Sequence, residues 1–185
     1  MTQASKNVLR KEILRKRQAM PEKEWQTKSN LICDRLVNLP LFTQADTIFA
    51  YFSFRKEVDL TSLYCLNKNW AFPRCVDDFL VWHLWRPGED LVEDKYGIQT
   101  PLETATTVSI TSADLILVPT VACDRQGYRL GYGGGFYDRL LGSVHRPDIQ
   151  AIGITFDFTF KERLPVDSWD TKLDSVCTEI EFVSY

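Results

Sequence analysis

The stretch Asp114–Leu141, DLILVPTVACDRQGYRLGYGGGFYDRLL, contains the parts of one strand–loop–helix unit. Its first part, LILV, is a short apolar run that is typical of a buried strand, and the strand is expected to end at Pro119. A turn is expected over Asp124–Gly127, and a helix is expected to begin near Phe136. In an open α/β sheet, ligands bind beyond the carboxyl ends of the strands. The stretch therefore predicts an α/β fold and a ligand site at its loop.

The rest of the chain alternates between predicted helices and predicted strands. Helices are expected over Ser5–Met20, Glu22–Asn38 and Leu60–Asn67, and strands over Thr47–Ser53, Trp70–Pro73, Phe79–Trp85, Gln150–Thr155 and Val176–Val183. The second helix offers Trp25, Leu31, Ile32 and Leu36 as core residues. Such alternation predicts an α/β sheet with helices on both faces. Since the chain has 185 residues and no evident linker, we expect one domain over residues 1–185.

Four glycines fall within five positions of the loop: Gly131, Gly133, Gly134 and Gly135. This density lets backbone amides approach a ligand and point at an anion, and the following helix adds the positive end of its dipole. The spacing differs from Gly-x-Gly-x-x-Gly, and no Gly-Lys-[Ser/Thr] follows, so the loop is neither a dinucleotide loop nor a Walker A loop. We favour phosphate binding over a tight turn that needs glycine only for packing.

Asp138 lies in the first turn of the helix that follows the loop. Beside a polyphosphate, a lone carboxylate would repel the ligand, whereas a carboxylate that helps to hold Mg²⁺ would attract it. An Asp in the first turn also stabilises a helix without any metal. The residues alone leave both roles open.

Composition and charge exclude several classes of protein. The formal net charge of -3 does not favour nucleic-acid binding, although the first predicted helix has a basic face, which from the residues alone we interpret as solvated. No run is long enough for a membrane span, and the polar first residues exclude a signal peptide. The five cysteines are scattered, and His83 and His145 lie near none of them, so we expect reduced thiols in a cytoplasmic protein, with His145 at the surface.

The segment VPTVACDRQGYRLGYGGGFYDRLL closely resembles the signature of 5-formyltetrahydrofolate cyclo-ligases, also called methenyltetrahydrofolate synthetases. The resemblance extends over nearly the whole chain and includes Tyr51–Asp59 (YFSFRKEVD) and Pro165–Glu179 (PVDSWDTKLDSVCTE). It implies a compact, mostly parallel α/β domain that is Rossmann-like, of the sugar-phosphate-isomerase/CoA-transferase-like kind. It also implies an enzyme that uses ATP and Mg²⁺ to cyclise 5-formyltetrahydrofolate to 5,10-methenyltetrahydrofolate. We expect this enzyme to be a monomer.

The resemblance also assigns site residues. It implies an ATP site made of Lys6, Arg10, Arg129, Leu130, Gly131, Tyr132, Gly133, Gly134, Gly135, Phe136 and Tyr137. It implies folate contacts from Phe52, Glu57, Tyr132, Gly133, Gly134, Gly135 and Phe136. Asp138 and Asp170 are the implied Mg²⁺ ligands, and Arg129 and Arg139 are the implied catalytic residues, in contact with phosphate. For Glu57, the alternative is an ordinary surface Glu beside Lys56.

Some positions depart from the family pattern. Thr120 and Cys123 replace the usual Gly and Phe, and Ser168 and Trp169 stand where Glu and His often occur. Three other functions stay open: a sugar-phosphate isomerase, a non-catalytic folate- or nucleotide-binding module, and a nucleic-acid binder. If ATP stabilises the protein only with Mg²⁺, the sugar-phosphate isomerase is disfavoured. Folate binding without turnover would favour the binding module, and strongly salt-dependent affinity would favour the nucleic-acid binder.

Overall fold

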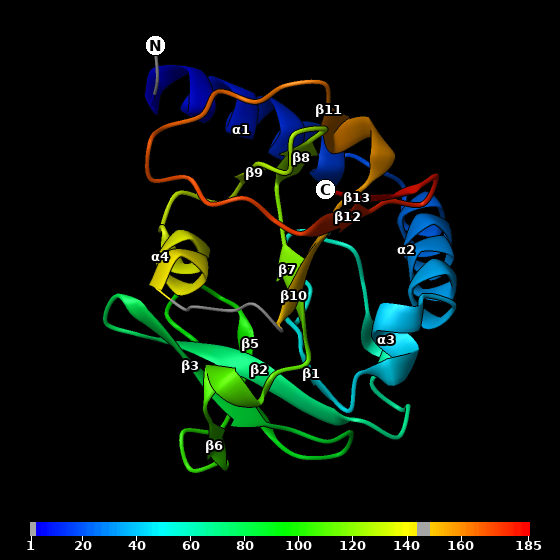
Figure 1. Ribbon diagram of the computed structural model, residues 1–185, viewed down its shortest axis with the longest axis vertical. Helices are drawn as coiled ribbons and strands as arrows, with labels where there is room; N and C mark the ends of the chain where they lie inside the picture. The colour runs from blue at the N-terminus through cyan, green and yellow to red at the C-terminus, as the bar shows by residue number, and fades with distance from the viewer. Residues whose placement is uncertain (1–2, 144–148) are drawn as a thin grey trace.

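The computed structural model describes residues 3–143 and 149–185 of the chain (Figure 1). The expectation for His145 lies outside this described part. The helices are α1 (Gln3–Gln18), α2 (Glu22–Val37), α3 (Pro40–Gln44) and α4 (Phe136–Ser143). The strands are β1 (Thr47–Phe49), β2 (Asn69–Val76), β3 (Phe79–Leu84), β4 (Leu91–Glu93), β5 (Gln99–Pro101), β6 (Thr107–Val108), β7 (Leu115–Pro119), β8 (Ala122–Asp124), β9 (Arg129–Leu130), β10 (Gln150–Ile154), β11 (Phe160–Lys161), β12 (Ser175–Cys177) and β13 (Phe182–Ser184).

The main sheet has eight strands in the order β13-β12-β10-β7-β1-β2-β3-β6. Its central strands, from β12 through β10, β7 and β1 to β2, are parallel. Antiparallel pairs extend it at both edges, with β13 beside β12 at one edge and β3 and β6 at the other. The predicted α/β fold with a mostly parallel sheet is confirmed. Two small sheets, β11-β8-β9 and β4-β5, lie outside it.

Strand β7 shows why both faces of the sheet are covered. Successive side chains of a strand point to opposite faces. Leu115 and Leu117 pack in the cluster that contains side chains of α2 and α3, whereas Ile116 and Val118 pack in the cluster that contains Leu141 of α4. Helices α2 and α3 therefore cover one face and α4 the other, as Figure 1 shows.

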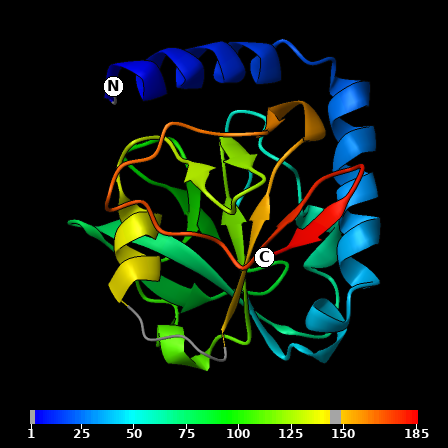
Figure 2. The same ribbon diagram turned by 45° about the horizontal axis from the view of Figure 1, so that its top comes forward.

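Helix α1 lies across the molecule, beside the carboxyl end of β7 (Figure 2). Its buried Ile13 packs against Val121, Ala122 and Leu130, which belong to the small sheet and to the segment before it. The basic face of α1 thus lies next to the loop that follows β7. None of the helices in the described residues has the length and apolar character needed to cross a membrane.

Several predicted boundaries are wrong. The run predicted as one strand over Val176–Val183 is the hairpin β12–β13, because the Thr178 hydroxyl accepts the Ile180 and Glu181 amides and turns the chain. The helix predicted over Leu60–Asn67 is a single 3₁₀ turn at Thr61–Leu63.

The first predicted strand is also shorter than expected. It ends at Phe49, because the chain then leaves the sheet and places Tyr51 and Phe52 in a cavity. On α2, Leu31 is exposed and Cys33 takes the buried position instead, while Ile32 and Leu36 are buried as predicted.

Candidate functional site

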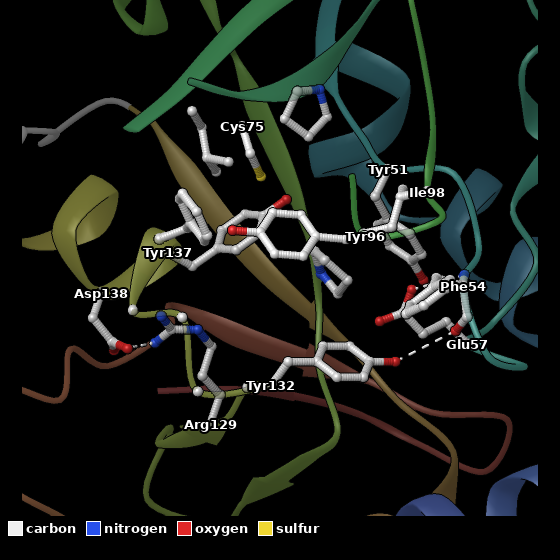
Figure 3. A pocket seen from close by; sticks show the side chains of 18 of the residues that line it. Tyr51, Phe54, Glu57, Cys75, Tyr96, Ile98, Arg129, Tyr132, Tyr137 and Asp138 are labelled. Carbon is white, nitrogen blue, oxygen red and sulfur yellow. Dashed lines mark hydrogen bonds and ion pairs between the residues drawn. The ribbon is translucent and has the colours of Figure 1, made fainter. Parts of the chain in front are cut away.

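A cavity of about 890 Å³ lies at the carboxyl ends of β1 and β7 (Figure 3). All of the predicted site residues line it: Lys6, Arg10, Phe52, Glu57, Arg129, Leu130, Gly131, Tyr132, Gly133, Gly134, Gly135, Phe136, Tyr137, Asp138, Arg139 and Asp170. Arg129 and Asp138 lie on one side of the cavity, and Glu57 and Phe54 lie on the other. The fold thus brings the loop, the basic helix and the segment after β1 to one site.

Two positions of the loop require glycine. Gly133 and Gly135 have φ values of +105° and +71°, which side chains other than glycine rarely adopt. A Cβ at Gly135 would also lie 2.7 Å from Nη1 of Arg139. The glycines therefore allow a backbone conformation that other residues rarely adopt, and they leave the backbone of the loop open toward the cavity.

Arg10 connects α1 to this loop. Its Nε donates to the Gly131 carbonyl at 2.7 Å, and its guanidinium lies 3.7 Å from the point where a Cβ of Gly133 would stand. A cation is thus held directly against the glycine loop, as an anion site requires.

Arg129 is the buried cation of the loop. Its side chain is 3% exposed and lies 2.9 Å from Oδ1 of Asp138, and its Nη1 also donates to the Thr171 carbonyl. Asp138 therefore lies in the first turn of α4 with a cation beside it. The ion pair fixes both side chains at the edge of the cavity.

Arg139 has a different environment. Its Nη2 donates to the Gly134 carbonyl at 2.9 Å and its Nε donates to the Asp78 carbonyl at 2.7 Å, while its guanidinium stacks on the Phe136 ring. These contacts hold the glycine loop against the turn between β2 and β3.

Lys6 joins α1 to the segment near the end of the chain. Its Nζ lies 2.8 Å from a carboxylate oxygen of Asp167 and 2.5 Å from one of Asp170, and all three side chains are nearly buried. Asp170, like Asp138, is thus paired with a cation. The two predicted Mg²⁺ ligands, Asp138 and Asp170, therefore line the same cavity although they are distant in sequence.

The described residues contain no ready-made protein cage for a metal. Among residues 3–143 and 149–185, no three His, Cys, Asp or Glu side chains gather closely enough to bind an ion. Mg²⁺, however, is usually held by one or two carboxylates together with substrate phosphates and water. Asp138 is 28% exposed beside the glycine loop, so its donor chemistry fits such an ion.

Glu57 is a buried carboxylate, not the surface residue of the alternative interpretation. Its side chain turns inward after Arg55 and Lys56, both of which have positive φ, and only 5% of the residue is exposed. One carboxylate oxygen accepts the Phe54 amide at 3.0 Å. Burial raises the pKa of Glu57 to about 7, although the charge of Arg17 and the Phe54 amide oppose this rise.

Phe52 forms part of an aromatic wall. Its ring stacks on Phe72 at 4.1 Å between centroids, and the ring of Trp85 lies perpendicular to it at 5.1 Å. Phe72 is fully buried, so this side of the cavity is a continuation of the core. A flat apolar ligand fits against such a wall.

Sequence reasoning missed several residues of the cavity. Cys75, Tyr96, Ile98 and Trp169 line it without being among the predicted site residues. Arg17 does not line the cavity, but it belongs to the basic helix face that is predicted to be solvated, and only 2% of the residue is exposed. The signal was present in the spacing of residues 6, 10, 13 and 17, which places all four on one face of a helix.

Comparison with known proteins identifies a family for this chain. The model of the 5-formyltetrahydrofolate cyclo-ligase family matches residues 2–179. The 5-formyltetrahydrofolate cyclo-ligase of Escherichia coli (strain K12) is 30% identical over 175 residues, which cover 90% of this chain and 96% of that protein. That of Mycoplasma pneumoniae is 32% identical over 176 residues and covers 94% of this chain and 98% of its own.

Solved structures show the same relationship. The NMR structure of Aquifex aeolicus 5,10-methenyltetrahydrofolate synthetase has a TM-score of 0.86 and 34% identity, covering 97% of this chain and 92% of its own. The 5,10-methenyltetrahydrofolate synthetase of Mycoplasma pneumoniae has a TM-score of 0.77 and 26% identity, covering 94% and 98%. The chain therefore belongs to the 5-formyltetrahydrofolate cyclo-ligase family.

Proposed function

We propose that the protein catalyses the ATP-dependent cyclisation of 5-formyltetrahydrofolate to 5,10-methenyltetrahydrofolate, with release of ADP and phosphate. Beyond family membership, one observation carries the proposal. A single cavity joins a glycine loop flanked by cations to a buried carboxylate and an aromatic wall. The first half suits a polyphosphate and the second suits a pterin, so both substrates fit side by side.

The reaction needs an activated formyl oxygen. That oxygen attacks the γ-phosphorus of ATP, the bond from this phosphorus to the bridging oxygen breaks, and ADP leaves. N10 then attacks the formyl carbon and loses its proton, after which the carbon–oxygen bond breaks and inorganic phosphate leaves. One carbon then bridges N5 and N10. Phosphoryl transfer of this kind depends on alignment and charge compensation more than on covalent help from the protein.

The phosphate side of the site supplies both. The amides of the glycine loop bind phosphate oxygens, with Lys6, Arg10 and Arg129 as the nearby cations. Arg129 and Arg139 are the catalytic residues of this proposal, because they line the cavity where the transferred phosphoryl group must lie. Mg²⁺ bound by Asp138, with Asp170 in support, would neutralise phosphate charge.

The folate side orients the second substrate. Glu57 accepts hydrogen bonds from adjacent N–H groups at the pterin edge, and Phe52 packs against the ring. Residues 132–136 line the cavity, and in this proposal they contact both ligands. Holding the formyl oxygen next to the γ-phosphate in this way turns two binding events into one reactive geometry.

An absorbance assay tests the proposal. Purified protein is mixed with 5-formyltetrahydrofolate, ATP and Mg²⁺, and the near-ultraviolet absorbance of methenyltetrahydrofolate is followed. We expect a rise that needs both ATP and Mg²⁺ and that falls about 100-fold or more in Asp138→Ala. Asp34→Ala, on the exposed face of α2, is the matched control and keeps the wild-type rate. Folate and ATP binding without any rise would contradict the proposal.

We also propose that residues 1–185 form one domain, which works as a monomer in the cytoplasm and binds neither nucleic acid nor membranes. Every predicted site residue comes from the same chain and lines one cavity, which supports a monomer. The five cysteines are free, as in a reducing compartment. Light scattering during gel filtration tests the oligomeric state, and a dimer mass would contradict this part of the proposal.

A further inference from the structure

Arg17 is a fully buried cation in the last turn of α1. It follows Lys6 and Arg10 along the face of the helix that is turned toward the cavity. Arg17 does not line the cavity itself, and its guanidinium has no carboxylate within ion-pair distance among the interactions of the described residues. A buried arginine is costly unless its donors are used. The contacts that it makes therefore indicate what it does.

The three nitrogen atoms of the guanidinium bind three different segments. Nε donates to the Arg55 carbonyl at 3.1 Å and Nη1 donates to the Thr120 carbonyl at 3.0 Å. Nη2 donates to the Tyr132 hydroxyl, and the guanidinium also lies 5.7 Å from the centre of the Tyr132 ring. One side chain thus joins the turn before Glu57, the segment after β7 and the glycine loop.

The same side chain determines the charge around Glu57. The titratable groups that face Glu57 are Arg17 of α1 and the hydroxyls of Tyr51, Tyr64, Tyr132 and Tyr137. Burial raises the pKa of all four tyrosines, so these hydroxyls stay neutral near pH 7. Within the described residues, Arg17 is then the charged group that favours the ionised form of Glu57.

We propose that Arg17 is a positioning residue for the folate: it holds Tyr132 of the glycine loop against the turn that carries Glu57 and supplies the positive charge at that end of the cavity. The inference rests on the proposed function and deepens it. Arg17 acts through Tyr132 and Glu57 and touches neither substrate. Its removal loosens the folate half of the site and leaves the phosphate half, held by Arg10 and Arg129, in place.

The test compares Arg17→Met with Arg15→Met, which makes the same change on the exposed face of the same helix. KM for 5-formyltetrahydrofolate and KM for ATP are measured separately from pH 6 to pH 9. For Arg17→Met we expect folate KM to rise about tenfold or more with ATP KM within about twofold of wild type. In wild type, folate affinity falls as pH drops through the pKa of Glu57, and in Arg17→Met this fall moves to higher pH by about one pH unit.

Two further variants decide the matter if Arg17→Met does not fold. Arg17→Lys keeps the charge but cannot reach three acceptors, so we expect a wild-type pH profile with folate KM raised several-fold. Tyr132→Phe removes the hydroxyl that Arg17 binds and should raise folate KM in the same direction. Wild-type folate KM in Arg17→Lys and Tyr132→Phe would overturn the proposal.

The remaining outcomes are equally distinct. If Arg17→Met raises KM for folate and KM for ATP equally and leaves the pH profile unchanged, Arg17 only supports the fold. This result also overturns the proposal. If wild type binds folate without cyclising it, the proposed function fails. Arg17 is then judged by the folate Kd of the same variants, measured from tryptophan fluorescence.

Discussion

At the scale of single residues, Glu57 combines a functional position with an energetic cost. Its pKa of about 7 lies above the ordinary value of 4.5, so the folded protein holds a proton that the unfolded chain has already lost between these values. Stability therefore decreases as pH rises from about 5 to about 8. In the proposed function Glu57 is ionised when it binds folate, so the charge that serves binding lowers the stability of the protein near neutral pH.

Glu57→Gln makes this cost measurable. The amide cannot ionise, and its oxygen can still accept the Phe54 amide. We expect the free energy of unfolding of wild type to fall by about 2 kcal/mol relative to Glu57→Gln between pH 5 and pH 8. Urea unfolding at both pH values measures it. Glu103→Gln, at an exposed position, should show no such difference from wild type. If the free energies of unfolding of wild type and Glu57→Gln change equally with pH, Glu57 does not titrate in this range.

Residue roles could be predicted from the sequence only where a motif carried them. The resemblance placed Glu57 at the site, but nothing in YFSFRKEVD indicates that Arg55 and Lys56 turn the chain so that Glu57 points inward. Arg17 was missed for a related reason. Its three acceptors are Arg55, Thr120 and Tyr132, which are far away in sequence and become neighbours only in the folded chain.

At the scale of elements, the glycine loop contains two kinds of glycine. Gly135 has positive φ, and a Cβ there would push the Arg139 guanidinium away, whereas Gly131 has neither constraint and a Cβ there meets no protein atom. We expect Gly135→Ala to destabilise the loop by about 1–2 kcal/mol and to raise KM for ATP about tenfold. Gly131→Ala is the matched control for stability and should keep the wild-type free energy of unfolding, because a Cβ there meets no protein atom.

Thermal unfolding and ATP-dependent kinetics check this pair. The substitution at Gly135 displaces Arg139, whose guanidinium also stacks on Phe136. A wild-type KM in Gly135→Ala would show that the loop does not bind phosphate in the strained arrangement. If Gly135→Ala and Gly131→Ala lower the stability equally, any methyl group added to the loop has this effect, and the positive φ of Gly135 is not the cause.

Elements with their own local signal could be predicted, and the others could not. The apolar runs of β7 and β10 and the helical periods of α1 and α2 are local, so their existence and type were confirmed. Strands β8, β9 and β11 have two or three residues each, and β4 and β5 have three. Strands this short leave no periodic pattern in the sequence, and β11 also depends on a distant partner, since Phe160 lies beside Cys123.

At the scale of the whole molecule, Lys6 joins the first helix to the segment near the end of the chain. Its removal leaves the nearly buried Asp167 and Asp170 side by side without their cation. We expect Lys6→Met to lower the free energy of unfolding by about 2 kcal/mol and to speed amide exchange in α1. Lys16→Met is the control, because its pair with Glu12 is exposed and contributes little. Equal stability in the two variants would show that the ion pairs of Lys6 do not stabilise the docking of α1.

The position of α1 has a further consequence. In the proposed function, one helix carries Lys6 and Arg10 near its start, on the phosphate side, and Arg17 near its end, on the folate side. A displacement of the helix that favours one ligand therefore changes the affinity for the other. Such linkage is reciprocal, so whatever factor ATP adds to the affinity for folate, folate adds to the affinity for ATP. The proposed function together with this position of α1 therefore predicts heterotropic cooperativity between ATP and folate.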